Sequence, residues 1–223
     1  MAARRSPDPD PTALALLPRA ASEPIAEHAV LLPGYASTQA GEFFAAVRAV
    51  VAAAPWRHMV TPGGLTMSVA MTNCGQVGWV TDRHGYRYTD TDPDAGRHWP
   101  AMPSVMRMLA MRAASSAGFS GFEPDACLIN RYEPGSRLSL HQDRNERDLS
   151  APVVSVSLGL PALFLFGGLK RADPTRRIPL QHADVVVWGG AQRLAFHGIA
   201  KLADGHHALT GRCRINLTFR QAL

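Results

Sequence analysis

From Asp125 to its last residue, the sequence is a series of short β-type segments with no helical segment between them. Pro, Gly and Asp turns separate these segments, each of which is rich in β-branched, aromatic or leucine residues. Several short strands in series predict a sandwich or a jelly-roll barrel. The expected strands are 127–132, 138–143, 153–160, 162–166, 177–180, 184–188, 193–197 and 212–220.

The preceding part of the chain contains two helical patterns. Apolar residues at helical spacing predict one helix from residue 37 or 38 to about Ala54, where Pro55 stops it. A second helix is expected from about Pro103 to Ala117. Between them, residues 56–100 are expected to form irregular strands and turns.

Composition sets only broad limits. The 223 residues suffice for a substantial core, and a formal charge of +5 with a pI near 9.6 permits a polyanionic partner without requiring one. Cys74, Cys127 and Cys213 lie far apart, which argues against a structural zinc site and fits reduced thiols. No apolar run approaches the ~20 residues that span a bilayer. We therefore expect a cytoplasmic protein with no membrane partner.

His141 and Asp143 form a His-x-Asp pair at the end of one expected strand. Side chains at i and i+2 of a strand leave the same face, about 6.6 Å apart along the backbone, so both could approach one metal ion. Such a pair with a distant His is typical of the site that holds Fe(II) and leaves positions open for a co-substrate and O₂. The pair alone is a weak signal, because His182 and Asp184 form a second copy.

The position of His197 favours the first pair. His197 is expected to close the strand 194–196, and it follows Asp143 by a gap that holds about four strands. That gap is enough to travel round a barrel and return beside the first strand. His197 follows Asp184 by a single hairpin, which weakens the second pairing without excluding it. His182 and Asp184 are interpreted as turn residues before the next strand.

The last expected strand has a polar face and an apolar face. Its polar residues stand at even positions and mostly apolar residues at odd positions. Arginine is not fully buried without a partner, so the polar face is either solvated or lines a cavity built for an anion. The polar residues are Arg214, Asn216, Thr218 and Arg220. On an earlier strand, Asn130 and Tyr132 share a face and offer an amide and a phenol.

Four aromatic residues crowd the polar segment between the two helices. They are Trp79, Tyr86, Tyr88 and Trp99. Such residues either form a small satellite core or build a wall that stacks on a flat ligand such as a base. The pattern alone does not choose between these two interpretations.

Together these motifs resemble the AlkB family, bacterial dioxygenases that repair alkylated DNA. The resemblance runs in order over residues 28–223 and leaves the N-terminal residues outside it. It rests on Asn130-Arg-Tyr132, His141-Gln-Asp143, Ser155-Val-Ser-Leu-Gly-Leu-Pro161, Phe166-Gly-Gly-Leu-Lys-Arg171, Asp184-Val-Val-Val-Trp-Gly-Gly190, His197-Gly, Arg214-x-Asn-Leu-Thr-Phe-Arg220, Asn73-Cys-Gly-x-x-Gly-Trp79 and Trp99-Pro-Ala-Met-Pro103.

The resemblance implies a mainly β, α+β fold. It implies a single dioxygenase domain (28–223), with a nucleotide-recognition lid (56–90) and a double-stranded β-helix, or jelly-roll, core (125–223). Residues 1–27 lie outside the resemblance and are rich in Pro, Ala and charge, so we interpret them as a flexible extension. The resemblance also implies Fe(II), 2-oxoglutarate and O₂ as cofactor and co-substrates. The implied substrates are 1-methyladenine and 3-methylcytosine in DNA, preferably single-stranded, and also in RNA. The sequence leaves the oligomeric state open, and a monomer is the expectation.

The resemblance also assigns roles to residues of this chain. The implied iron ligands are His141, Asp143 and His197. The implied 2-oxoglutarate site is Asn130, Tyr132, Arg214, Asn216 and Arg220, with Arg214 on the distal carboxylate. The residues implied to embrace the flipped base and its neighbouring nucleotide are Trp79, Tyr86 and Arg171.

The chain departs from the family pattern at Asn145, where His-x-Asp-x-Asp would have a second acid. An amide both donates and accepts hydrogen bonds, whereas a carboxylate only accepts them, so the preference among lesions is open. Two other functions compete with DNA repair. One is a 2-oxoglutarate-dependent hydroxylase of a substrate other than nucleic acid. The other is a non-catalytic β-barrel binding module.

Overall fold

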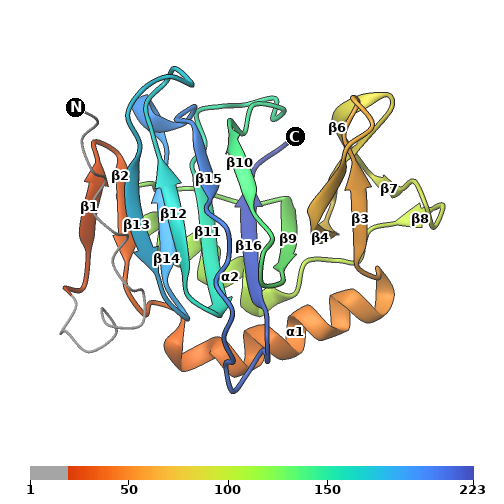
Figure 1. The fold of residues 1–223 in the computed structure, drawn as a ribbon, viewed down its shortest axis with the longest axis horizontal. Helices are drawn as coiled ribbons and strands as arrows, with labels where there is room; N and C mark the ends of the chain where they lie inside the picture. Colours follow the sequence, from red (N-terminus) through yellow and green to blue (C-terminus); the bar gives the residue numbers. More distant parts are fainter. Residues whose placement is uncertain (1–19) are drawn as a thin grey trace, which may run out of the picture.

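The computed structural model describes residues 20–223, and two facing β-sheets form its centre (Figure 1). The larger sheet has eight strands in the order β1-β2-β14-β11-β16-β9-β4-β3, and the smaller has four in the order β10-β15-β12-β13. This is the predicted jelly-roll arrangement. The larger sheet comprises β1 (Glu23–Ala26), β2 (Ala29–Leu32), β3 (Arg57–Val60), β4 (Thr66–Gly75), β9 (Ala126–Tyr132), β11 (Val153–Gly159), β14 (Val185–Trp188) and β16 (Arg214–Arg220). The smaller comprises β10 (Leu138–His141), β12 (Ala162–Phe166), β13 (Arg176–Leu180) and β15 (His197–Ile199).

Both expected helices are present, and they pack on the outer face of the larger sheet. A 3-10 turn, η2 (Ser37–Gln39), leads into α1 (Ala40–Ala53), and α2 (Ser104–Ser116) begins directly after Pro103. Phe43 and Val47 of α1 and Leu109 of α2 are buried against that face. Burial of these apolar stripes holds the helices in place.

Two small hairpins follow β4. The first, β5 (Gly78–Asp82) with β6 (Gly85–Thr89), is called the aromatic hairpin below, and the second pairs β7 (Thr91–Asp92) with β8 (Arg97–His98). Trp99 and Tyr88 are packed in core clusters, as a satellite core requires. Trp79 also packs against one of these clusters, but it lines a cavity together with Tyr86, so the aromatic residues divide between the two interpretations.

Strand β16 occupies the middle of the larger sheet, between β11 and β9. Its odd-numbered residues, such as Leu217 and Phe219, pack toward the helices. Its even-numbered residues line the cavity between the two sheets, and all seven residues of the strand are buried. The polar face therefore lines a cavity and is not solvated. The residues on that face are Arg214, Asn216, Thr218 and Arg220.

Two expected strand limits near the metal motif are wrong. Strand β10 ends at His141, so Asp143 lies in the loop after the strand and not on it. The reason is that β15, its antiparallel partner, begins at His197 opposite His141 and offers no backbone beyond that point. The expected strand 193–197 is a turn after η3 (Gly190–Gln192), because the Ala195 N–H bonds the Gln192 carbonyl. His197 therefore opens a strand and does not close one.

The last residues of the expected N-terminal extension (1–27) form a strand. Residues 1–19 lie outside the described residues, but Glu23–Ala26 form β1, which pairs with β2 at the edge of the larger sheet. Ile25 is buried there, and His28 takes a positive φ of 56° in the tight connection. An apolar side chain packed in the core fixes this segment, so residues 23–26 belong to the larger sheet and not to a flexible extension.

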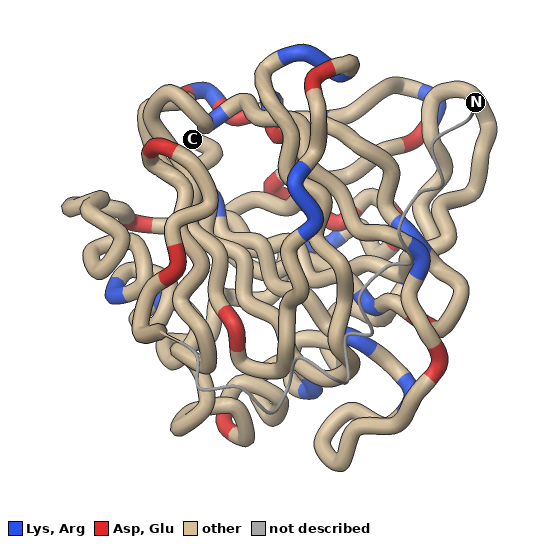
Figure 2. The backbone as a smooth tube through the Cα atoms, turned by 60° about the vertical axis from the view of Figure 1, so that its left-hand side comes forward, with Lys and Arg blue, Asp and Glu red and all other residues tan. Residues whose placement is uncertain are grey.

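Charged residues of both signs are spread over many loops and strands (Figure 2). Lys and Arg exceed Asp and Glu by five over the whole sequence. Within residues 20–223, no helix is both long enough and apolar enough to cross a lipid bilayer.

Gly159, at the end of β11, pairs with Arg214 on the neighbouring strand and has no space for a side chain. Its φ is +90°, and a Cβ there would lie 2.1 Å from Thr210 Oγ1 and 2.5 Å from the Cys213 carbonyl oxygen. We expect Gly159→Ala to lower the free energy of unfolding in urea by about 2 kcal/mol or more. Gly41→Ala, where a Cβ meets nothing within 4 Å, is the matched control and should not destabilise. Equal stability of the two variants would contradict this account.

Candidate active site

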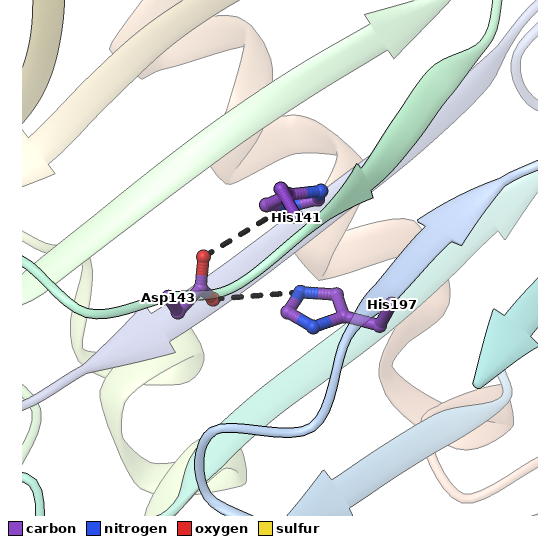
Figure 3. Close-up of side chains that lie close together, drawn as sticks. All are labelled: His141, Asp143 and His197. Carbon is purple, nitrogen blue, oxygen red and sulfur yellow. Dashed lines mark ion pairs between the residues drawn. The ribbon is translucent and has the colours of Figure 1, made fainter. Parts of the chain in front are cut away.

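Three potential metal ligands converge where β10 and β15 meet (Figure 3). His141 Nε2 lies 3.8 Å from Asp143 Oδ1, and His197 Nε2 lies 3.8 Å from Asp143 Oδ2. One donor atom from each residue falls within 4.8 Å of the other two. These residues come from different strands and the loop between them, so the fold assembles the trio that the spacing predicted. The second copy, His182 and Asp184, lies in the turn before β14.

The backbone sets which imidazole nitrogen faces the centre of the trio. The Nδ1 of His141 lies 2.8 Å from the Ser139 carbonyl oxygen, and the Nδ1 of His197 lies 3.0 Å from the Ala195 carbonyl oxygen. A carbonyl only accepts, so each Nδ1 carries the proton and each Nε2 presents a lone pair. Both rings are thereby oriented as metal ligands usually are.

Electrostatics keeps Asp143 and His197 in the forms that bind a metal ion. Burial alone would raise the pKa of Asp143, but Arg220, together with His197 and His141, outweighs it and holds that pKa below the usual range. Arg220 donates to Asp143 Oδ2 from Nε at 2.9 Å and from a terminal nitrogen at 2.7 Å. Burial, helped by nearby His141, lowers the pKa of His197 to about 4. At neutral pH the site therefore holds an ionised carboxylate and a neutral buried imidazole.

Arg214 is a buried cation with unused donors. Its Nη2 donates to Ser157 Oγ at 2.9 Å, whereas its Nε and Nη1 make no hydrogen bond within residues 20–223. Burial lowers the pKa of Arg214 from its usual value, yet a guanidinium stays protonated. Buried donors without partners are costly, so this arrangement fits a ligand carboxylate that arrives in the cavity.

The amide and phenol groups predicted for the same ligand line the same cavity as Arg214. The Arg214 guanidinium carbon lies 5.1 Å from the ring centre of Tyr132, and burial raises the pKa of Tyr132 to about 12, so its hydroxyl keeps its proton. Asn216 Nδ2 donates to Ser155 Oγ at 2.7 Å. Asn130 Oδ1 is buried and has no hydrogen-bond partner among the described residues. Together these groups suit a small polar anion such as a keto acid.

One cavity of about 680 Å³ is lined by His141, Asp143 and His197, by Arg214, and by side chains of the aromatic hairpin. At the hairpin, Trp79 and Tyr86 stack with ring centres 5.7 Å apart and planes 23° from parallel. Trp79 Nε1 donates to Asn145 Oδ1 at 3.2 Å, which ties the hairpin to the loop after Asp143. Arg171 lines the cavity as well, with one donor on the Leu140 carbonyl at 2.6 Å. The predicted base-contacting residues thus share one cavity with the metal trio.

Sequence reasoning missed three residues around this centre. Glu146 and Arg193 are almost fully buried and lie 3.1 Å apart, Arg193 Nη2 to Glu146 Oε2. Trp188 lines the cavity, with its ring centre 4.8 Å from that of His197. Glu146 stands in an irregular loop without periodicity, so no pattern marked it as buried. The nearest available signal was its position three residues after Asp143.

Comparison with known proteins agrees with this geometry. The sequence model of the 2OG-Fe(II) oxygenase superfamily matches residues 28–220. The alpha-ketoglutarate-dependent dioxygenase AlkB of Escherichia coli (strain K12) is 58% identical over 200 residues, which cover 90% of this chain and 93% of that protein. The chain belongs to the AlkB family of the 2OG-Fe(II) oxygenase superfamily. It is an Fe(II)- and 2-oxoglutarate-dependent dioxygenase.

Other relatives extend the family assignment. The AlkB homolog of Caulobacter vibrioides (strain NA1000 / CB15N) is 46% identical over 182 residues, covering 80% of this chain and 81% of that protein. The solved structure of OsALKBH1 superposes with a TM-score of 0.79 at 26% identity, covering 90% of this chain and 99% of that one. The resemblance stated from motifs is confirmed, and so is the fold class.

The lowered pKa of His197 makes the stability of the metal-free protein depend on pH. Its pKa is about 4 in the folded state and about 6.5 when unfolded, so the unfolded chain takes up the proton first as pH falls. The stability from the neutral ring is complete above pH 6.5 and is lost as pH falls toward 4. We expect His197 to account for about 2 kcal/mol of the loss in unfolding free energy between pH 7.5 and pH 5.

Urea denaturation of the metal-free protein at the two pH values measures this loss. His197→Gln should show a smaller loss, because the titrating ring is gone. His84→Gln, in an exposed turn of the aromatic hairpin, is the control and should lose as much stability as the native chain. An equal loss in the native chain and in His197→Gln would contradict the assigned state of His197.

Proposed function

We propose that this enzyme removes methyl groups from ring nitrogens of damaged bases, with 1-methyladenine and 3-methylcytosine in DNA as its substrates. The observation that carries the proposal is the cavity itself. It joins the His141, Asp143 and His197 trio to the stacked pair of Trp79 and Tyr86. A flat group that enters beside these rings lies in the same cavity as the metal ligands.

In this proposal His141, Asp143 and His197 hold Fe(II), and Arg214 receives the far carboxylate of 2-oxoglutarate. Asn130, Tyr132, Asn216 and Arg220 complete the keto-acid site. The unpartnered donors of Arg214 and the acceptor of Asn130 support this assignment. When bound, Fe(II) with 2-oxoglutarate and O₂ supplies the oxidation of the N-methyl group, and the products are formaldehyde, succinate, CO₂ and the repaired base.

The protein's part is to bind and orient the damaged nucleotide. Extruding a base costs a few kcal/mol, and less when methylation already prevents pairing. Methylation at these nitrogens leaves the base cationic, so stacking on Trp79 would add a cation–π attraction of about 0.5–2 kcal/mol. We assign Tyr86 and Arg171 to the same nucleotide, and residues 56–90 to a nucleotide-recognition lid within a single domain that also includes β1.

The remaining features of the proposal concern partners and location. Stacking on an aromatic ring does not depend on the sugar, so RNA is a second substrate. Single strands are preferred because their bases need no unpairing. The buried thiols of Cys74, Cys127 and Cys213 form no disulfide, which supports a reducing cytoplasm. We propose a monomer as the acting unit.

A formaldehyde assay tests the reaction. With Fe(II) and 2-oxoglutarate, the protein should release formaldehyde from single-stranded oligonucleotides that carry 1-methyladenine or 3-methylcytosine. Asp143→Ala should reduce release to background because it removes a metal ligand. Trp79→Ala should lower turnover of the oligonucleotide about tenfold or more through lost stacking. Native release no higher than that of Asp143→Ala would refute the proposal, and full activity of Trp79→Ala would favour a substrate other than nucleic acid.

Asn145 should set the preference among lesions. Its amide accepts from Trp79 and retains a donor for the base edge, whereas an aspartate at this position would only accept. We expect Asn145→Asp to change the ratio of turnover on 1-methyladenine to turnover on 3-methylcytosine by about threefold or more. Mass spectrometry of a panel of defined oligonucleotides measures that ratio. The same ratio in both proteins would show that Asn145 does not read the base.

A further inference from the structure

Glu146 is a buried acid in contact with three polar side chains. Its own side chain is 1% exposed. The Tyr88 hydroxyl donates to Oε1 at 2.6 Å, Arg220 Nε lies 3.4 Å from Oε1, and Arg193 Nη2 lies 3.1 Å from Oε2. An ionised carboxylate this deeply buried is stable only when cations and donors surround it.

The same two arginines also hold Asp143. Arg220 directs Nε and a terminal nitrogen at Asp143 Oδ2, and Arg193 Nη1 donates to the Asp143 carbonyl oxygen at 2.7 Å. Two cations and two anions therefore share one buried cluster, with side chains that are 8% exposed or less. Their formal charges cancel.

This balance matters for a metal ligand. Asp143 can attract a divalent cation with its full negative charge only if other groups offset the arginines beside it. Without the carboxylate of Glu146, one positive charge would remain uncompensated in contact with Asp143. Repulsion between that charge and an incoming cation is strong in a buried site, because water does not screen it.

We infer that Glu146 is a positioning residue for the metal site. Its carboxylate offsets Arg193 and Arg220, so that Asp143 remains free to bind a divalent cation. Through Tyr88 it also anchors the aromatic hairpin beside that ligand. The inference rests on the proposed assignment of His141, Asp143 and His197 as metal ligands.

Titration of the metal-free, full-length protein with Co(II), followed by its visible absorption, tests the inference. Glu146→Gln preserves the shape of the side chain and an oxygen for Tyr88, but removes the charge. We expect it to raise the Kd for Co(II) at least tenfold. Glu123→Gln, which changes an exposed partner of Arg107, is the matched control and should leave the Kd within twofold of the native value.

Removing a positive charge from the same cluster distinguishes an electrostatic role of Glu146 from a purely structural one. Arg193→Gln deletes a cation from the cluster and should bind Co(II) as tightly as the native chain or more tightly. The double variant Glu146→Gln/Arg193→Gln restores the balance and should bring the Kd back to within threefold of the native value. If the cluster of Glu146 and Arg193 served only to hold the fold, all three variants would bind Co(II) more weakly than the native chain. Far-ultraviolet circular dichroism and thermal unfolding confirm which variants are folded.

The outcomes are distinguishable. A Kd for Glu146→Gln within threefold of the native value overturns the inference about Glu146 and leaves the metal ligands intact. Should Glu146→Gln fail to fold, Arg193→Gln alone decides, and a Kd raised more than threefold in that variant overturns the inference. Native protein that binds no Co(II), or binds it unchanged after Asp143→Ala, overturns both this inference and the proposed metal site.

Discussion

The ion pair between Asp143 and Arg220 joins the two parts of the molecule on which the site depends. Asp143 lies in the loop that follows β10 of the smaller sheet, and Arg220 ends β16, the central strand of the larger one. Both side chains are almost fully buried. A buried pair of this kind contributes little net stability, but removing one partner leaves an uncompensated charge. Its main effect is to place a carboxylate beside two imidazoles and keep it ionised.

Strand β16 supplies the other half of the arrangement. Its period-2 pattern divides the strand between the helix-facing core and the cavity. Leu217 and Phe219 secure the strand against α1 and α2. The same backbone places Arg214 on the cavity face, where its Nε and Nη1 have no hydrogen-bond partner within residues 20–223. Hydrophobic packing on the helix-facing side of β16 thus positions the polar side chains that line the cavity on its other side.

Much of this could be predicted from local patterns. Helical spacing located α1 and α2 to within a few residues, and the alternation of β16 identified which residues would share a face. Pairing across the sheets was less accessible. The end of β10 depends on where β15 begins, which is a non-local contact, so Asp143 was assigned to a strand although it lies in a loop. Glu146 and Arg193 were missed because irregular segments carry them, and only the folded chain shows that they meet. The family resemblance named the candidate site residues but did not reveal how their charges are balanced.

The central proposal is that one metal ion binds His141, Asp143 and His197, and that Arg214 receives the far carboxylate of the keto acid. A crystal structure of the protein with Mn(II) and 2-oxoglutarate, grown without oxygen, tests it most directly. The account predicts a single metal ion bound by Nε2 of His141, Nε2 of His197 and one oxygen of Asp143, with the far carboxylate of the keto acid on Arg214. A metal ion held by other residues, or a keto acid that leaves the donors of Arg214 unbonded, would contradict it.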